Sequence, residues 1–352
     1  LAEAENPVIF AQRGAGSAEG FAALAALAEA WGIPVCQYWA VQLAIATDHP
    51  MAAQADPKPL LDKADVVLVL DALAPWSPDA HPLKPGCKVI QLAQDPLYQR
   101  QPVRYFRSDV TLACDVDAGL LALKAAMDLL LPIHRAKAER NAREVAARNR
   151  AARAGVLETA RRGNGTPMTK DFVSLTLSEA LAGRDATVLS ELGCPMAPMT
   201  LAHHQAWYQE PHSGGLGWCF PAALGMQLAR RDRLVVATMG DGSYMFANPV
   251  ACHQIAEALD LPILVLIVNN AEWGAVRQSV LGLYPDGYAA KTNRMPLTAL
   301  SPVPDFVKVA EASRAYARRV TDGAALAGAI AEALEHIETK RTLALIDVQV
   351  RA

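Results

Sequence analysis

Two short apolar runs, each followed at once by small polar residues, constrain this 352-residue chain more than any other feature. Residues 234–239 (LVVATM) precede GDGS at 240–243, and residues 263–268 (ILVLIV) precede an asparagine pair at 269–270. Continuous apolar runs of this length are typical of parallel strands that are buried on both faces of a sheet. The sequence therefore predicts two buried strands, each ending in a polar cluster.

A helix predicted between the two runs brings the polar clusters together. Residues 249–259 are expected to be helical, with Asn248 as the N-cap and Pro249 at the first helical position. A strand, a crossover helix and a second parallel strand form one right-handed unit. Both clusters should therefore lie at the carboxyl edge of one sheet, where open α/β sheets bind ligands.

The two clusters offer oxygen ligands for a hydrated divalent cation that holds a diphosphate. Mg²⁺ prefers oxygen ligands in an octahedron and usually takes one or two protein side chains together with phosphate oxygens. Asp241 offers a carboxylate, Asn270 an amide oxygen and Glu272 its backbone carbonyl. Backbone that can closely approach the anion is expected at Gly240, Gly242 and Ser243. These residues predict a magnesium–diphosphate site.

GDG followed after 26 residues by NN resembles the cofactor motif of the thiamine diphosphate enzymes. Residues 212–229 (HSGGLGWCFPAALGMQLA) resemble the phrase that precedes this motif in benzoylformate decarboxylase and acetolactate synthase. The resemblance implies that Leu216 supports the bent cofactor and that the Gly214 carbonyl accepts a hydrogen bond from its amino group. The remaining cofactor contacts that the resemblance implies are Gly193, Cys194, Gly215 and Trp273.

Alternation of predicted strands and helices indicates an α/β protein with two doubly wound parallel-sheet domains. We expect a central Rossmann-like domain at 1–130, a basic helical linker at 131–166 and a thiamine diphosphate-binding domain at 167–352. The phrases PVIFAQRGAG, ADVVLVLD and KVIQLAQDP resemble the central domain of acetolactate synthase-like enzymes. Within the last domain, residues 282–295 are expected to form a polar loop, which is either a gate over the site or an ordinary surface loop.

Nucleotide binding by the first domain has weak support in the sequence. The turn at 14–16 (GAG) precedes a predicted helix, but the third glycine of a dinucleotide motif is misplaced, at Gly20. Some relatives bind FAD in this domain and others leave it empty. Residues 72–76 (ALAPW) stand where an acidic–arginine pair is expected. FAD is therefore a doubtful cofactor, and we expect the domain to serve as a scaffold.

Composition excludes several classes of partner. The net charge is −3 and the estimated pI is 6.3, which favours neither nucleic acid nor an anionic membrane. No apolar run approaches the roughly 20 residues of a membrane span, and no signal peptide is evident. The six cysteines are scattered without a CxxC pair, which indicates reduced thiols and a cytoplasmic protein.

Four histidines between residues 203 and 253 do not have the spacing of a zinc site. His253, on the predicted crossover helix, is interpreted as structural. His212, beside the glycine-rich phrase, is a candidate to face the substrate. The other histidines of the group are His203 and His204.

The resemblance implies a C–C lyase or carboligase that acts on a 2-oxo acid with thiamine diphosphate and Mg²⁺. Such enzymes also need a glutamate from a pyrimidine-binding domain. Glu3 and Glu5 lie in the wrong context for that role, and the chain starts at Leu1 without an initiator Met. We therefore expect this domain to come from another segment or subunit, within a homodimer or tetramer. The alternatives are a non-catalytic or regulatory subunit, a decarboxylase of aromatic 2-oxo acids and, more distantly, a flavin- or NAD-dependent oxidoreductase.

Overall fold

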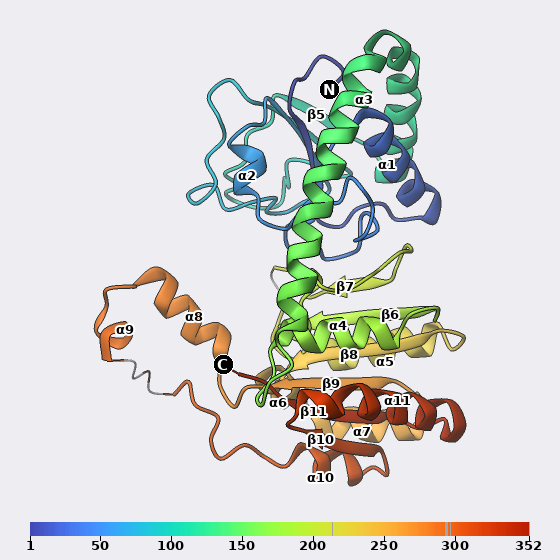
Figure 1. Ribbon diagram of the computed structural model, residues 1–352, viewed down its shortest axis with the longest axis vertical. Coiled ribbons are helices and arrows are strands. Elements are labelled where there is room, and N and C mark those ends of the chain that lie inside the picture. The colour runs from blue at the N-terminus through green and yellow to red at the C-terminus, as the bar shows by residue number, and fades with distance from the viewer. Residues whose placement is uncertain (213, 293–294, 296, 352) are drawn as a thin grey trace. The chain divides into compact units, whose positions relative to one another are not determined.

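The computed structural model describes residues 1–351 except 213, 293, 294 and 296. The chain forms two compact units, one comprising residues 1–156 and 200–212, the other residues 157–199 and 213–352. Each unit is built around a parallel sheet with helices packed on it (Figure 1). The expected α/β class with two doubly wound domains is therefore confirmed.

The sheet of the first unit has the strand order β2-β1-β3-β4-β5, and every neighbouring pair is parallel. Its strands are β1 (Pro7–Ala11), β2 (Val35–Cys36), β3 (Val66–Leu70), β4 (Lys88–Ala93) and β5 (Val110–Ala113). The short β7 (Trp207–Gln209) lies in the segment 200–212. The helices are α1 (Ala18–Trp31), α2 (Lys58–Leu61) and α3 (Val116–Arg161). The exposed β5 (VTLA) was not predicted, because its four residues are too few to give a recognisable strand pattern.

Local sequence explains why α1 begins and ends where it does. The Ser17 hydroxyl accepts a hydrogen bond from Gly20 N at 3.0 Å, which caps the first turn. Gly32 follows the last turn with φ 64°, a left-handed conformation that suits glycine. A Cβ at Gly32 would also lie 2.2 Å from the Ala142 nitrogen, so α3 can pass close to this turn.

In the second unit five parallel strands run in the order β10-β11-β9-β8-β6. They are β6 (Ala186–Glu191), β8 (Leu234–Gly240), β9 (Leu264–Asn269), β10 (Tyr316–Val320) and β11 (Ala344–Gln349). Strands β6 and β9 are buried along their whole length. Burial on both faces is the reason that they are continuously apolar rather than alternating.

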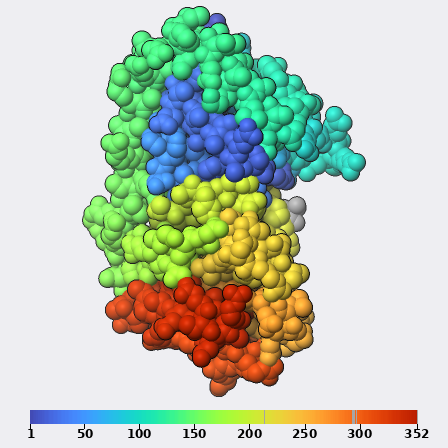
Figure 2. Space-filling model, turned by 90° about the vertical axis from the view of Figure 1, so that its right-hand side faces the viewer, coloured from blue at the N-terminus to red at the C-terminus, as the bar shows by residue number. Residues whose placement is uncertain are grey.

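Helices cover this sheet in two pairs. The helices are α4 (Lys170–Ala180), α5 (Cys219–Ala229), α6 (Asp241–Phe246), α7 (Pro249–Ala258), α8 (Gly274–Leu283), α9 (Tyr288–Thr292), α10 (Phe306–Glu311) and α11 (Gly323–Lys340). Helix α4 packs against α11, and α5 packs against α7 (Figure 1). The packing of the first pair is also visible from the side in Figure 2, where the light-green segment of α4 borders the red segment of α11. Among the described residues, no helix combines the length and apolar character needed to cross a bilayer.

Three local features add to or differ from the expectations. Asn248 is the N-cap residue of α7 and Pro249 its first residue, as predicted, although the Asn248 backbone is left-handed (φ 55°) and its side chain makes no cap hydrogen bond. A short helix that was not predicted, α6, begins at Asp241 within the GDGS cluster. The expected polar loop at 282–295 contains α9, while residues 293 and 294 lie outside the described part of the chain.

Candidate active site

The two polar clusters meet at the carboxyl edge of the second sheet. Strands β8 and β9 are parallel neighbours, and Gly240 lies opposite Val268 in their register. Asp241 and Asn270 therefore leave the sheet side by side, as the sequence predicts. The backbone N–H of Ala271, next to Asn270, is close enough to Asp241 to offset part of the rise that burial causes in the pKa of its carboxyl.

Asp241 is a buried carboxylate with one oxygen unused. Asp241 is only 2% exposed. Oδ1 accepts the Gly242 N–H at 3.0 Å, whereas Oδ2 has no hydrogen-bond partner among the described residues. Burial raises the pKa of this carboxyl, and hydrogen bonds from Gly242 and Ala271 together with the charge of Lys170 oppose that rise. An orphaned carboxylate oxygen at a ligand-binding edge fits a cation such as Mg²⁺.

The adjacent asparagines have different roles. Asn269 is buried, and its Nδ2 donates to Asp347 Oδ1 at 2.9 Å while its Oδ1 accepts Ala271 N at 3.0 Å. Asp347 in turn accepts from Arg319 Nε at 2.8 Å. Asn269 thus fixes the strand end, and it is Asn270, only partly buried, that stands at the edge of the sheet. The Asn270 Oδ1 accepts Glu272 N at 3.3 Å, a weak bond that leaves an oxygen lone pair free.

Glu272 and Trp273 complete the second segment. The Glu272 carbonyl, the third predicted metal ligand, accepts Gly274 N at 2.7 Å and retains a second lone pair. The Glu272 side chain pairs with Arg277 at 3.3 Å. Trp273 lies against Gly242, where an added Cβ would be 2.3 Å from the indole Cζ3. Gly242 is therefore required by the indole ring, in addition to any approach of a phosphate.

The glycine-rich loop is tied down at one end. Gly214, Gly215 and Leu216 are exposed, Leu216 to 40%. Gly217, by contrast, is buried with φ 92°, and its N–H donates to Glu191 Oε1 at 2.7 Å. Sequence reasoning did not single out Glu191. The available signal is an acidic residue at the last position of an otherwise apolar buried strand.

The turn after β6 places the predicted residues Gly193 and Cys194 inside the unit. A Cβ at Gly193 would lie 2.4 Å from the Thr238 carbonyl carbon, so the backbone of β8 passes directly over it. Burial raises the pKa of the Cys194 thiol to about 12. The residue that is exposed at this turn is Leu192, whose carbonyl accepts Lys170 Nζ at 3.3 Å. Lys170 brings a positive charge close to Asp241.

The histidines do not form a metal centre. Among the described residues, no group of three His, Cys, Asp or Glu side chains is placed to hold a metal ion. His253 bonds through Nε2 to the Tyr244 hydroxyl at 2.8 Å and packs edge-on against Phe220, and burial lowers its pKa to about 4. This agrees with the interpretation of His253 as structural. His212 stacks on Trp39 within the first unit.

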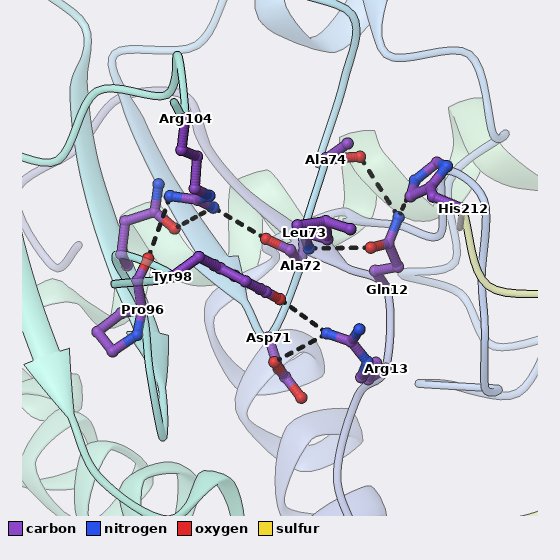
Figure 3. A network of polar contacts seen from close by, with 11 residues as sticks. Gln12, Arg13, Asp71, Ala72, Leu73, Ala74, Pro96, Tyr98, Arg104 and His212 are labelled. Carbon is purple, nitrogen blue, oxygen red and sulfur yellow. Dashed lines mark hydrogen bonds and ion pairs between the residues drawn. The ribbon is translucent and has the colours of Figure 1, made fainter. Parts of the chain in front are cut away.

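At the carboxyl edge of the first sheet, polar side chains form hydrogen bonds with one another and with backbone carbonyls (Figure 3). Arg13 donates to Tyr98 at 2.7 Å and to Asp71 at 3.4 Å, and Gln12 Nε2 contacts His212 Nε2 at 2.7 Å. Arg104 donates to the carbonyls of Ala72, at 3.0 Å, and Pro96, at 3.1 Å.

The start of α1 is likewise occupied. The Asp117 carboxylate accepts the Gly16 N–H at 3.0 Å, and a Cβ at Gly20 would lie 2.1 Å from Asp117 Oδ1. A carboxylate from α3 therefore takes the position that a phosphate has in dinucleotide-binding folds. The residues present at this edge do not fit a dinucleotide such as FAD.

Comparison with known proteins agrees with the two-unit division of the chain. Residues 193–348 match the family model of the thiamine pyrophosphate enzyme C-terminal TPP binding domain. Residues 1–123 match that of the thiamine pyrophosphate enzyme central domain.

Curated relatives carry acetolactate synthase names. The acetolactate synthase large subunit of Parasynechococcus marenigrum (strain WH8102) is 33% identical over 172 residues, which are 47% of this chain and 26% of the relative. The isozyme 3 large subunit of Escherichia coli (strain K12) is 31% identical over 146 residues, covering 41% of this chain and 23% of the relative. The matched part thus spans about a quarter of the length of these relatives.

Two solved structures share the fold. A 4-hydroxybenzoylformate decarboxylase of Rhodococcus jostii RHA1 superposes with a TM-score of 0.69 at 22% identity, and a benzoylformate decarboxylase of Polynucleobacter necessarius with 0.73 at 19%. In both cases 99% of this chain and 62% of the other chain are covered. The resemblance found in the GDG–NN motif is thereby confirmed, and the chain belongs to the thiamine pyrophosphate enzymes, of which it carries the central and the C-terminal cofactor-binding domains.

Proposed function

We propose that the protein containing this chain is a thiamine diphosphate- and Mg²⁺-dependent enzyme that makes or breaks a C–C bond of a 2-oxo acid. The observation that carries the proposal is the buried Asp241 Oδ2, which lacks a partner among the described residues and lies at the sheet edge beside the second polar cluster. Leaving such an atom unpaired is unfavourable, and a bound cation satisfies it.

The residues of this edge have distinct proposed roles. Asp241, Asn270 and the Glu272 carbonyl hold Mg²⁺, and Lys170 adds positive charge for the diphosphate. Backbone at the start of α6 approaches the anion. Its residues are Gly240, Gly242 and Ser243. The cofactor, when bound, supplies an electron sink for the carbon next to the substrate carbonyl.

The exposed loop shapes the cofactor. Leu216 supports the bend between its rings, and the Gly214 carbonyl accepts a hydrogen bond from its amino group. Gly215 and Trp273 line the same side. The ring-protonating glutamate comes, in this proposal, from a pyrimidine-binding domain in another segment or subunit of a cytoplasmic homo-oligomer. Lyase and carboligase activity share all of these residues, so the proposal covers both.

Titration of thiamine diphosphate into the full-length protein, with and without Mg²⁺, tests this proposal. Wild type should bind tightly only with Mg²⁺. Asp241→Ala should lose at least roughly a hundredfold in affinity, because removing even an outer partner of a metal ligand costs ten- to a hundredfold. Equal binding by wild type and mutant would refute the assignment. Tight binding without turnover of any 2-oxo acid would instead favour a non-catalytic subunit.

A further inference from the structure

We propose that Glu191 is the residue that positions the glycine-rich loop, residues 214–217, and through it the Leu216 side chain against the cofactor. This inference rests on the proposed function. Glu191 ends β6 and is only 2% exposed. A buried carboxylate needs specific hydrogen-bond donors. Here one donor belongs to the loop and the other to the helix that follows it.

The Glu191 carboxylate clamps two backbone groups. Oε1 accepts Gly217 N and Oε2 accepts Cys219 N, each at 2.7 Å. Cys219 is the first residue of α5, an eleven-residue helix, so the negative charge also lies at the positive end of the helix. Distances of 2.7 Å are those of strong, charge-assisted hydrogen bonds. The carboxylate thus fixes where the loop ends and where the helix begins.

Gly217 is held from the opposite side as well. Its φ of 92° is a conformation that side chains rarely adopt, and a Cβ would lie 2.6 Å from the Ala247 nitrogen and the Phe246 carbonyl carbon. These two residues end α6, the helix that Asp241 begins. Gly217 is therefore confined between Glu191 and the end of the helix that carries the proposed metal ligand.

The fixed position of Gly217 determines where the exposed loop residues lie. Leu216 immediately precedes Gly217, and Gly214 is three residues before it. Both are exposed, so their own packing does not fix them. The hydrogen bonds of Glu191 to Gly217 and Cys219, together with the packing of Gly217 against the end of α6, therefore orient the loop relative to the metal site. Glu191 contacts neither metal nor diphosphate in this proposal and is a positioning residue.

Two probes separate this role from cofactor binding in general. Thiamine diphosphate contacts both the metal site and the loop, whereas inorganic pyrophosphate with Mg²⁺ contacts only the metal site. In the full-length enzyme, Glu191→Gln places an amide N–H₂ against a backbone N–H and loses one clamp. Its affinity for thiamine diphosphate should fall roughly tenfold to a hundredfold, while its affinity for Mg²⁺–pyrophosphate stays at the wild-type value.

The controls distinguish the possible failures. Glu179→Gln, on the exposed face of α4, should bind both probes like wild type, and Asp241→Ala should lose both. Near-ultraviolet circular dichroism of the cofactor at saturation should change in Glu191→Gln and not in Glu179→Gln. A Glu191→Gln variant that binds both probes as wild type does, or that loses both, overturns the proposal. Wild-type enzyme that fails to bind thiamine diphosphate would refute the proposed function itself.

Discussion

At the scale of single residues, the candidate site residues are easier to recognise in the sequence than the residues that hold them in place. The placement of Asp241 and Asn270 at one edge of the sheet could be predicted because each follows an apolar run typical of a buried parallel strand; their role as Mg²⁺ ligands stays a prediction. The division of roles between Asn269 and Asn270 could not be predicted, since it depends on Asp347, which is 78 positions from Asn269 in the chain. Glu191 was missed for the same reason, because its partners are 26 and 28 positions away.

Gly242 should tolerate no side chain. Gly242→Ala forces a Cβ to within 2.3 Å of Trp273, and overpacking of this kind costs about 1–3 kcal/mol. The urea midpoint of the full-length protein should fall accordingly. Gly225→Ala is the matched control, because Gly225 lies within α5 with nothing within 4 Å of its Cβ position. That variant should gain roughly 0.5–1 kcal/mol. Equal effects of the two substitutions would contradict this account.

At the scale of elements, long buried strands were predictable and short helices were not. β6, β8 and β9 are recognisable because burial on both faces demands continuous apolar sequence. Helix α6 has six residues and begins inside the polar cluster, so neither periodicity nor a cap residue indicates it. The exposed β5 has only four residues, which are too few to show a strand pattern. Elements that are held by tertiary contacts rather than by their own sequence are thus the ones that were missed.

The contact between α6 and α7 should weaken in acid. Burial lowers the pKa of His253 on α7 to about 4 from 6.5, and its Nε2 bonds Tyr244 on α6. A group with a depressed basic pKa binds its proton more readily in the unfolded chain. Its stabilising effect is therefore complete above pH 6.5 and declines as the pH falls toward 4.

Between pH 7 and pH 5 the free energy of unfolding should fall by about 2 kcal/mol from this group alone. Urea unfolding at the two pH values measures the loss. His253→Leu removes the titrating ring, so the part of the pH dependence that belongs to His253 should vanish in that variant. An identical pH dependence of wild type and variant would show that His253 is not the cause.

At the scale of the whole molecule, the chain covers 62% of the structures with which it shares its fold. Sequence reasoning identified both domains because each carries its own apolar sheet and, in the second, a motif with defined spacing. It placed Asn248 correctly as the N-cap residue of α7, but it did not reveal that the Asn248 backbone is left-handed and that its side chain makes no cap hydrogen bond.

Isolated residues 1–352 should release negligible CO₂ from pyruvate or benzoylformate, because the ring-protonating glutamate is not expected in this chain. If residues 1–352 bind Mg²⁺–pyrophosphate and still do not release CO₂, the missing activity is due to the part of the site that would contact the pyrimidine ring. Adding the pyrimidine-binding domain as a separate polypeptide should restore turnover. Robust CO₂ release by residues 1–352 alone, relative to the full-length enzyme, would contradict the expectation.

The unpaired oxygen of Asp241 also makes the stability of the folded protein depend on the supply of its proposed ligands. A buried carboxylate oxygen without a hydrogen-bond partner among the described residues destabilises the folded chain, and ligands that bind only the folded form, such as the proposed metal and diphosphate, raise its stability in proportion to the logarithm of their concentration. If the proposed function holds, protein without thiamine diphosphate and Mg²⁺ should therefore open more often and be degraded faster by proteases.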